Sequence, residues 1–136
     1  MIKTIKLNTA HQKLFEITSQ VVDIVNEAKI SEGLCTLFLK HTSASLLIQE
    51  NADPSVLRDL ENWLNRLVPE GDSLYTHRQE GLDDMPAHIK TALTAVNLTI
   101  PIINGKLALG TWQGIFLWEH RHDIDQRSII IHILQG

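Results

Sequence analysis

Residues 109–122, LGTWQGIFLWEHRH, decide the fold of this chain, because an apolar run ends there abruptly in ionisable side chains. Successive side chains of a strand point to opposite faces, so Phe116 and Trp118 share one face while Ile115 and Leu117 share the other. Both faces are apolar. The run therefore predicts a central strand that is buried on two sides.

Two features of this run need an explanation of their own, a glycine in its middle and the polar residues at its end. Gly114, in the middle of the predicted strand, indicates a bulge or a close backbone approach. Glu119, His120 and Arg121 either mark the point where the strand reaches solvent or form one wall of a polar pocket. We favour the pocket, because other polar residues also stand at the ends of predicted elements.

Elements of both kinds surround this strand without regular alternation, which predicts a single α+β domain over residues 1–136. Thr18 or Ser19, Asp53, and Asp83 or Asp84 are the expected helix caps. Gly33 is expected just past the end of the first helix. The predicted strands cover 2–8, 14–17, 34–40, 44–50, 95–103, 106–120 and 127–134, and the predicted helices cover 19–29, 54–67 and 83–93.

Composition excludes several classes of protein. The net charge of −4 and the pI of about 5.9 argue against a nucleic-acid partner, since such proteins usually carry a basic face. No run approaches the roughly 20 apolar residues of a membrane span, and the start of the chain lacks the apolar core of a signal peptide. We expect a cytoplasmic protein in which the single cysteine, Cys35, is buried and inert.

Histidines at element ends are the strongest chemical signal, because nucleotide-binding and hydrolase motifs are absent from the sequence. His41 follows an apolar strand and is either a metal ligand or acid/base group, or a turn residue bonded to the hydroxyls after it. Asp84 and His88 are spaced i, i+4 on one helix face, where the positive end of the helix dipole favours a neutral imidazole. His132 is expected in the core or at an interface.

Three blocks carry a resemblance over essentially the whole chain: HTSASLLIQENADPSV (41–56), EGLDDMPAHIKTAL (80–93) and GKLALGTWQGIFLWEHR (105–121). In this order and spacing they resemble the YjbQ family. The resemblance implies a mixed, curved β-sheet with packed helices, assembled as a homotrimer. It also implies thiamine-phosphate synthase activity, in which a hydroxymethylpyrimidine diphosphate joins a thiazole phosphate and pyrophosphate leaves.

The resemblance also implies site residues near subunit contacts. The implied catalytic residues are His41, Glu50, Asp84, His88 and His120, and the implied substrate- and phosphate-binding residues are Thr42, Ser43, Ser45, Asn51, Gln113 and Arg121. We add Lys90 to the phosphate-binding residues as a cation in the second block. Asp53, Asp83 and Glu119 also stand at matching positions. HRQEG (77–81) departs from the string that is common in the family and leaves the role of His77 in doubt.

Two kinds of metal site remain open. Asp83, Asp84 and Glu50 suit magnesium, with Arg121, Lys90 and Lys40 meeting phosphate. The trio His41, His88 and His120 suits zinc or a similar transition metal, and the number of histidines favours it. The expected function is a metal-assisted transferase, and the alternative is a metal-binding trimer or a hydrolase of another small phosphorylated metabolite.

Overall fold

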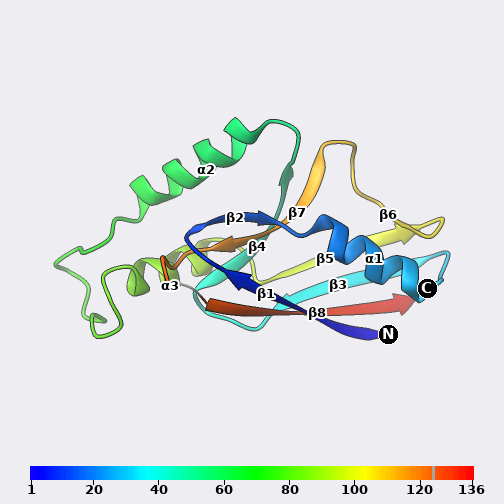
Figure 1. Cartoon of the computed structure of the whole chain (residues 1–136), viewed down its shortest axis with the longest axis horizontal. Coiled ribbons are helices and arrows are strands. Elements are labelled where there is room, and N and C mark those ends of the chain that lie inside the picture. The colour runs from blue at the N-terminus through cyan, green and yellow to red at the C-terminus, as the bar shows by residue number, and fades with distance from the viewer. Residues whose placement is uncertain (124) are drawn as a thin grey trace.

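The computed structural model describes residues 1–123 and 125–136. The described residues form one α+β domain, and the predicted order of strands and helices is confirmed (Figure 1). The elements are β1 (Ile2–Thr9), β2 (Lys13–Glu16), α1 (Thr18–Ala28), β3 (Gly33–Leu39), β4 (Ala44–Glu50), α2 (Pro54–Leu67), α3 (Asp84–Leu93), β5 (Asn97–Ile103), β6 (Lys106–Leu107), β7 (Gln113–Glu119) and β8 (Asp125–Gln135).

The strands form two curled sheets that together resemble half of a barrel. One sheet has the order β1-β8-β3-β5-β6 and the other the order β2-β7-β4. An antiparallel bridge between Leu46 and Ala95 joins β4 to the start of β5. Every strand pair in the described part of the chain is antiparallel, so the expected mixed sheet is wrong. The helices connect strands that belong to different sheets, whereas a parallel pair needs a crossover within one sheet.

Strand β7 is the central strand that its sequence predicts, since it pairs with β2 on one side and β4 on the other. Ile115 and Leu117 pack into the main core, between the two sheets and α1. Phe116 and Trp118 pack on the opposite face under α2, which lies above this sheet in Figure 1. The strand begins at Gln113, so Trp112 lies outside it and is exposed.

The helix ends follow the sequence only in part. Asp53 caps α2 as predicted, accepting a hydrogen bond from the backbone N–H of Ser55 at 2.9 Å. The expected cap of α1 is wrong, because Thr18 Oγ1 instead accepts the backbone N–H of Ile115 on β7. Lys29, in the left-handed conformation, ends α1 in place of the expected Gly33, which starts β3.

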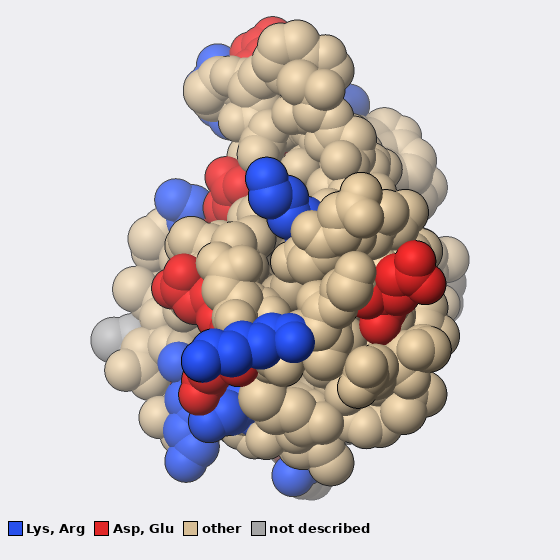
Figure 2. All heavy atoms as spheres, turned by 90° about the vertical axis from the view of Figure 1, so that its right-hand side faces the viewer, with Lys and Arg blue, Asp and Glu red and all other residues tan. Residues whose placement is uncertain are grey.

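The surface of the domain bears on the expectations about partners. No helix in the described ranges is long and apolar enough to cross a membrane. On the face that Figure 2 shows, Lys and Arg side chains stand among Asp and Glu side chains, and most of the face consists of other residues. His132 is exposed on β8, so its expected position in the core is wrong, and the alternative position at an interface stays a prediction.

Candidate metal centre

The start of α3 brings two carboxylates to the end of β7. Asp84 is the first residue of the helix, and its side chain is only 3% exposed. Asp83 precedes it, but its side chain does not cap the helix. Asp83 Oδ2 accepts hydrogen bonds from Arg121 Nε at 3.1 Å and from the backbone N–H of His122 at 2.9 Å. The expected cap is therefore wrong, and both carboxylates instead face the segment that follows β7.

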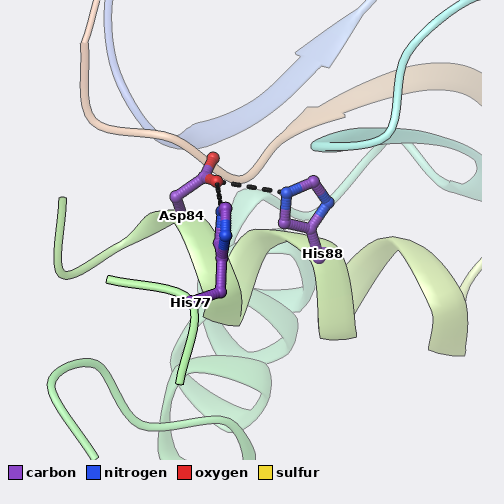
Figure 3. Close-up of side chains that lie close together, drawn as sticks. All are labelled: His77, Asp84 and His88. Atoms are coloured by element: carbon purple, nitrogen blue, oxygen red, sulfur yellow. Dashed lines mark hydrogen bonds and ion pairs between the residues drawn. The ribbon is translucent and has the colours of Figure 1, made fainter. Parts of the chain in front are cut away.

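His77 and His88 meet on one oxygen of Asp84 (Figure 3). His77 Nε2 lies 2.6 Å from Asp84 Oδ2, and His88 Nε2 lies 3.1 Å from the same oxygen. His88 reaches it from the next turn of α3, as the i, i+4 spacing predicts. His77 comes from the segment between α2 and α3, which is a loop as expected.

The two ring nitrogens of His88 both face oxygen atoms. Nδ1 lies 3.1 Å from the carbonyl oxygen of Thr42, and Nε2 faces the Asp84 carboxylate. A carbonyl oxygen and an ionised carboxylate only accept hydrogen bonds, and a neutral imidazole has one N–H to donate. A cation between Nε2 and Asp84 would satisfy the second nitrogen of a neutral ring.

Arg121 fixes the position of Asp84. Its Nη1 donates to Asp84 Oδ1, and its Nη2 donates to the carbonyl oxygen of Glu80 at 2.9 Å. Burial raises the pKa of Asp84, but hydrogen bonding from His77 and the charges of Arg121 and His88 outweigh it and hold that pKa below its usual value. Asp84 is thus an anion whose second oxygen remains directed at the two imidazoles.

The three side chains fit a transition-metal ion. Their ligand atoms all lie within 4.8 Å of one another. Two imidazole nitrogens and one carboxylate oxygen are a common set of three protein ligands for zinc, with a fourth position open to water or substrate. Bonds of about 2.0 Å in a tetrahedron place ligand atoms roughly 3.3 Å apart. The 3.1 Å between His88 Nε2 and Asp84 Oδ2 is close to this, whereas the 2.6 Å between His77 Nε2 and the same oxygen is that of a direct hydrogen bond, so His77 would have to move back to admit an ion. The Thr42 carbonyl on His88 Nδ1 is the kind of outer partner that orients a histidine ligand.

The expected trio of His41, His88 and His120 is not brought together within this chain. Among the described residues, the group with ligand atoms this close contains His77, Asp84 and His88. His41 Nε2 accepts a hydrogen bond from the backbone N–H of Ser128 at 2.9 Å, rather than bonding to the hydroxyls after it. Burial, followed by the charge of Arg127, lowers the pKa of His41 and keeps the ring neutral.

His120 is buried, with 1% of its surface exposed. Its Nε2 lies 2.8 Å from Ser45 Oγ, its ring packs against Trp118, and its Nδ1 has no hydrogen-bond partner among the described residues. Burial, with smaller effects from the charges of Lys90 and Arg127, lowers the pKa of His120 to about 3. At this strand end the polar contacts to α3 are therefore made by Arg121, and His120 itself is enclosed by the fold.

The residues expected to bind phosphate are mostly engaged elsewhere. Lys90 is 2% exposed and its Nζ donates to Asn65 Oδ1. Arg121 is bound to the two aspartates, and Ser43 Oγ accepts from Arg127 at 2.9 Å. Thr42 and Lys40 are exposed.

The three residues of the expected magnesium site, Asp83, Asp84 and Glu50, are also not brought together within this chain. Ala44 starts β4 beside Glu119, and Glu50 ends it beside Gln113. Six residues at about 3.3 Å each place Glu50 roughly 20 Å from the start of β4. Asn51 follows Glu50 at this far end of the sheet, where its side chain donates to Glu16. The roles implied for Glu50, Asn51 and Gln113 stay predictions that this chain alone does not connect to Asp84.

Two residues were missed by sequence reasoning. His77 lies in a loop whose sequence departs from the family string, and only its seven-residue distance from Asp84 hinted at a link. Arg127 is 2% exposed, and its guanidinium pairs with the fully buried carboxylate of Glu119. An arginine among the apolar residues of a predicted core strand was the available signal, because a buried charge needs a partner.

The family model and the curated relatives that match this chain all belong to one protein family. The family model described as UPF0047 protein YjbQ-like matches residues 3–136. The UPF0047 protein sll1880 of Synechocystis is 54% identical over 92% of this chain and 85% of its own length. The UPF0047 protein YjbQ of Escherichia coli O157:H7 is 40% identical over 98% of this chain and 96% of its own.

Solved structures agree. A YjbQ/UPF0047 family protein of Clostridium acetobutylicum superposes with a TM-score of 0.89 at 35% identity, covering 97% of this chain and 99% of that one. A conserved hypothetical protein of Thermus thermophilus gives a TM-score of 0.87 at 32% identity, over 97% of this chain and 99% of its own. With matches along nearly its whole length, the chain belongs to the YjbQ-like UPF0047 protein family.

Proposed function

We propose that this protein binds one divalent transition-metal ion through His77, Asp84 and His88 and acts on a small phosphorylated metabolite there. The arrangement of His88 supports this most directly, since its two nitrogens face oxygens that only accept hydrogen bonds. An ion between His88 and Asp84 would satisfy the second nitrogen without adding a proton to the ring. The resemblance to the YjbQ family makes thiamine-phosphate synthesis the expected reaction.

The metal, when bound, would supply positive charge to the oxygens of a leaving pyrophosphate. The chain supplies the rest of the site. Arg121 holds Asp84 in place, and the Thr42 carbonyl orients His88. A cavity of about 180 Å³ adjoins the cluster, lined by His77 together with Tyr75, Arg78 and Leu82 among others. Its size suits part of a small metabolite.

A second candidate is a hydrolase of another phosphorylated metabolite, or a metal-binding protein without transferase activity. It is favoured by the state of Lys90 and Arg121, two cations expected to meet phosphate. Lys90 is buried on Asn65, and Arg121 is occupied by carboxylates. A transferase with two phosphorylated substrates needs more free cations than a site that binds a single phosphate.

We also propose self-association as a homotrimer through the outer face of the larger sheet. This face runs across β1, β8 and β3 to β5 and carries exposed apolar side chains on each of these strands. They are Ile2, Leu34, Phe38, Ile103 and Leu134. Exposed apolar patches commonly mark an interface.

Metal binding is tested first, on protein purified without a histidine tag. We expect about one equivalent of zinc or a similar metal by elemental analysis, and a visible Co²⁺ spectrum on reconstitution. His77→Ala and His88→Ala should each lower the affinity at least tenfold, about the loss seen for weaker outer-shell changes. Asp23→Ala is the matched control, because Asp23 is an exposed carboxylate on α1, outside the cluster and the proposed interface. Equal Co²⁺ binding by all four proteins would remove the proposed site.

Activity is tested separately, with the metal-loaded protein and both phosphorylated substrates. Pyrophosphate release that is lost in His88→Ala would support the transferase. Release of inorganic phosphate from other metabolites, without thiamine phosphate, would favour the hydrolase. Metal binding with neither product would leave the protein as a metal-binding member of the family.

A further inference from the structure

We infer that Arg127 is a positioning residue, which holds both outer partners of the metal-binding group through Glu119 and Ser43. The inference rests on the proposed metal site, but the contacts that carry it lie outside that site. Arg127 is on β8 and touches none of His77, Asp84 and His88 in the described hydrogen bonds and ion pairs.

The Arg127–Glu119 pair is the most deeply buried ion pair of the described chain, with side chains 2% and 0% exposed. Arg127 Nε donates to Glu119 Oε1 at 2.6 Å, and Nη2 donates to Glu119 Oε2. Thr9 Oγ1 also donates to Glu119 Oε1. The planar guanidinium presents its donors in a fixed fork, so this pairing sets the direction of the remaining N–H groups.

The first branch of the network runs from Arg127 to His88. One N–H of Arg127 Nη2 goes to Glu119, and the other is shared between Ser43 Oγ at 2.9 Å and the Ser43 carbonyl oxygen at 3.2 Å. Ser43 shares a peptide unit with Thr42, whose carbonyl oxygen lies 3.1 Å from His88 Nδ1. Holding Ser43 from both its side chain and its backbone therefore fixes the oxygen that orients His88.

The second branch runs from Glu119 to Asp84. Glu119 Oε2 accepts the backbone N–H of Arg121 at 3.1 Å. The side chain of Arg121 then holds Asp83 and Asp84. One ion pair thus sets the backbone on both sides of the metal-binding group, at the carbonyl behind His88 and at the arginine behind Asp84.

Stability alone is a poor explanation for this pair. Replacing a buried ion pair by well-packed apolar residues is often neutral or stabilising, because both charges lose their hydration on folding. Apolar residues could fill the space, but they could not bond Ser43 and Arg121 at the same time. The directional contacts, rather than the burial of charge, are what the pair adds to the fold.

Two variants test the inference. Arg127→Lys keeps the charge beside Glu119 but lacks the fork that reaches Ser43. The double variant Arg127→Met with Glu119→Gln removes both charges and leaves an amide oxygen to accept from Arg121. Both variants lose the contact with Ser43, so we expect Co²⁺ affinity to fall about tenfold in each, with an altered visible spectrum.

The control is Ile102→Val, which loosens the main core on β5 without touching the network. It should lower the melting temperature and leave Co²⁺ affinity and spectrum unchanged. A second readout needs no metal: nitrogen-15 NMR of the imidazoles should show a slowly exchanging proton on His88 Nδ1 in the wild type. That proton should exchange faster in the Arg127 variants.

The outcomes separate the two proposals. If the wild type binds Co²⁺ and the Arg127 variants bind it with the same affinity and spectrum, the positioning role is overturned. If the wild type binds no metal, the proposed metal site fails and the NMR readout decides the positioning role alone. Unchanged exchange at His88 Nδ1 would then count against Arg127. If the double variant does not fold, Co²⁺ binding and proton exchange at His88 Nδ1 are both measured on Arg127→Lys alone.

Discussion

Arg121 and Asp84 divide the two oxygens of one carboxylate between different tasks. Oδ1 accepts from the guanidinium, and Oδ2 faces His77 and His88. Because Asp84 is nearly buried, this division also determines which way its remaining charge points. The geometry of the candidate metal centre therefore depends on a cation that would not itself touch the metal.

Arg121→Gln should weaken metal binding about tenfold or more, since outer partners of metal ligands typically contribute 10- to 100-fold in affinity. Calorimetric titration with zinc would measure the change. Arg66→Gln, on the exposed surface of α2, is the matched control. A variant at Arg121 that binds zinc as tightly as the control would mean that Asp84 holds its orientation without the guanidinium.

His120 should make the protein sensitive to mild acid. Burial, with the charges of Lys90 and Arg127, lowers its pKa from 6.5 to about 3. Between pH 6.5 and pH 3, His120 therefore binds a proton in the unfolded chain but not in the folded chain. Stability from this residue is fully present above about pH 6.5 and is lost as the pH falls from 6.5 towards 3. Between pH 6.5 and pH 5 the loss is roughly 2 kcal/mol, at 1.36 kcal/mol per pH unit.

Urea denaturation of the wild type and His120→Gln at pH 7.5 and pH 5 measures this effect. Glutamine cannot be protonated in this range, and its amide can still bond to Ser45. The variant should be less stable at pH 7.5 but lose about 2 kcal/mol less on acidification. Parallel losses in both proteins would show that other groups cause the acid sensitivity.

Local patterns predicted most of the elements but not how side chains at their ends are used. The apolar alternation in β7 and the Asp-Pro start of α2 were sufficient, because each depends on neighbours in sequence. The hydrogen bond between Thr18 and Ile115 joins residues that are 97 positions apart, and no local sequence pattern predicts it. The same is true of His41, whose partner Ser128 lies on β8.

In the candidate site too, the sequence predicted the local relations but not the long-range contacts. Asp84 and His88 were found because an i, i+4 spacing on a helix is a local relation. His120 was placed at the correct strand end, but the sequence could not show that neighbours such as Trp118 and Ser45 would enclose it. His77 was missed because loop residues have no periodicity from which their direction can be read.

Gly114→Ala should destabilise the fold by about 1–3 kcal/mol through overpacking. A Cβ at this position would lie 2.7 Å from Glu16 Oε2 and 3.0 Å from Asn51 Cβ, so the atoms that approach Gly114 belong to side chains and not to the backbone that was expected. The pairing of Gln49 with Gly114 is regular, so there is no bulge at this point. Thermal unfolding would measure the loss, and Glu16→Ala in the same chain should recover part of it. No recovery would place the strain at Asn51.

The proposed trimer predicts that charge on the outer sheet face will separate the subunits. Phe38 and Leu134 lie on neighbouring strands, are 48% and 58% exposed, and contribute no side chain to the buried core. Phe38→Glu with Leu134→Glu should leave the fold intact, because both side chains already face outward. Sedimentation equilibrium should then report a monomer of 15.4 kDa where the wild type gives about three times that mass.

Leu74→Glu with Leu82→Glu is the matched control, since these leucines are at least as exposed but lie in the loop before α3. A trimer that survives the sheet variants and dissociates with the loop variants would move the interface to the loop that carries His77. A wild type that is already monomeric would leave the apolar sheet face without the partner proposed for it. Dissociation by the sheet variants alone supports the proposed interface, because burying a charged carboxylate against apolar side chains of another subunit costs several kcal/mol.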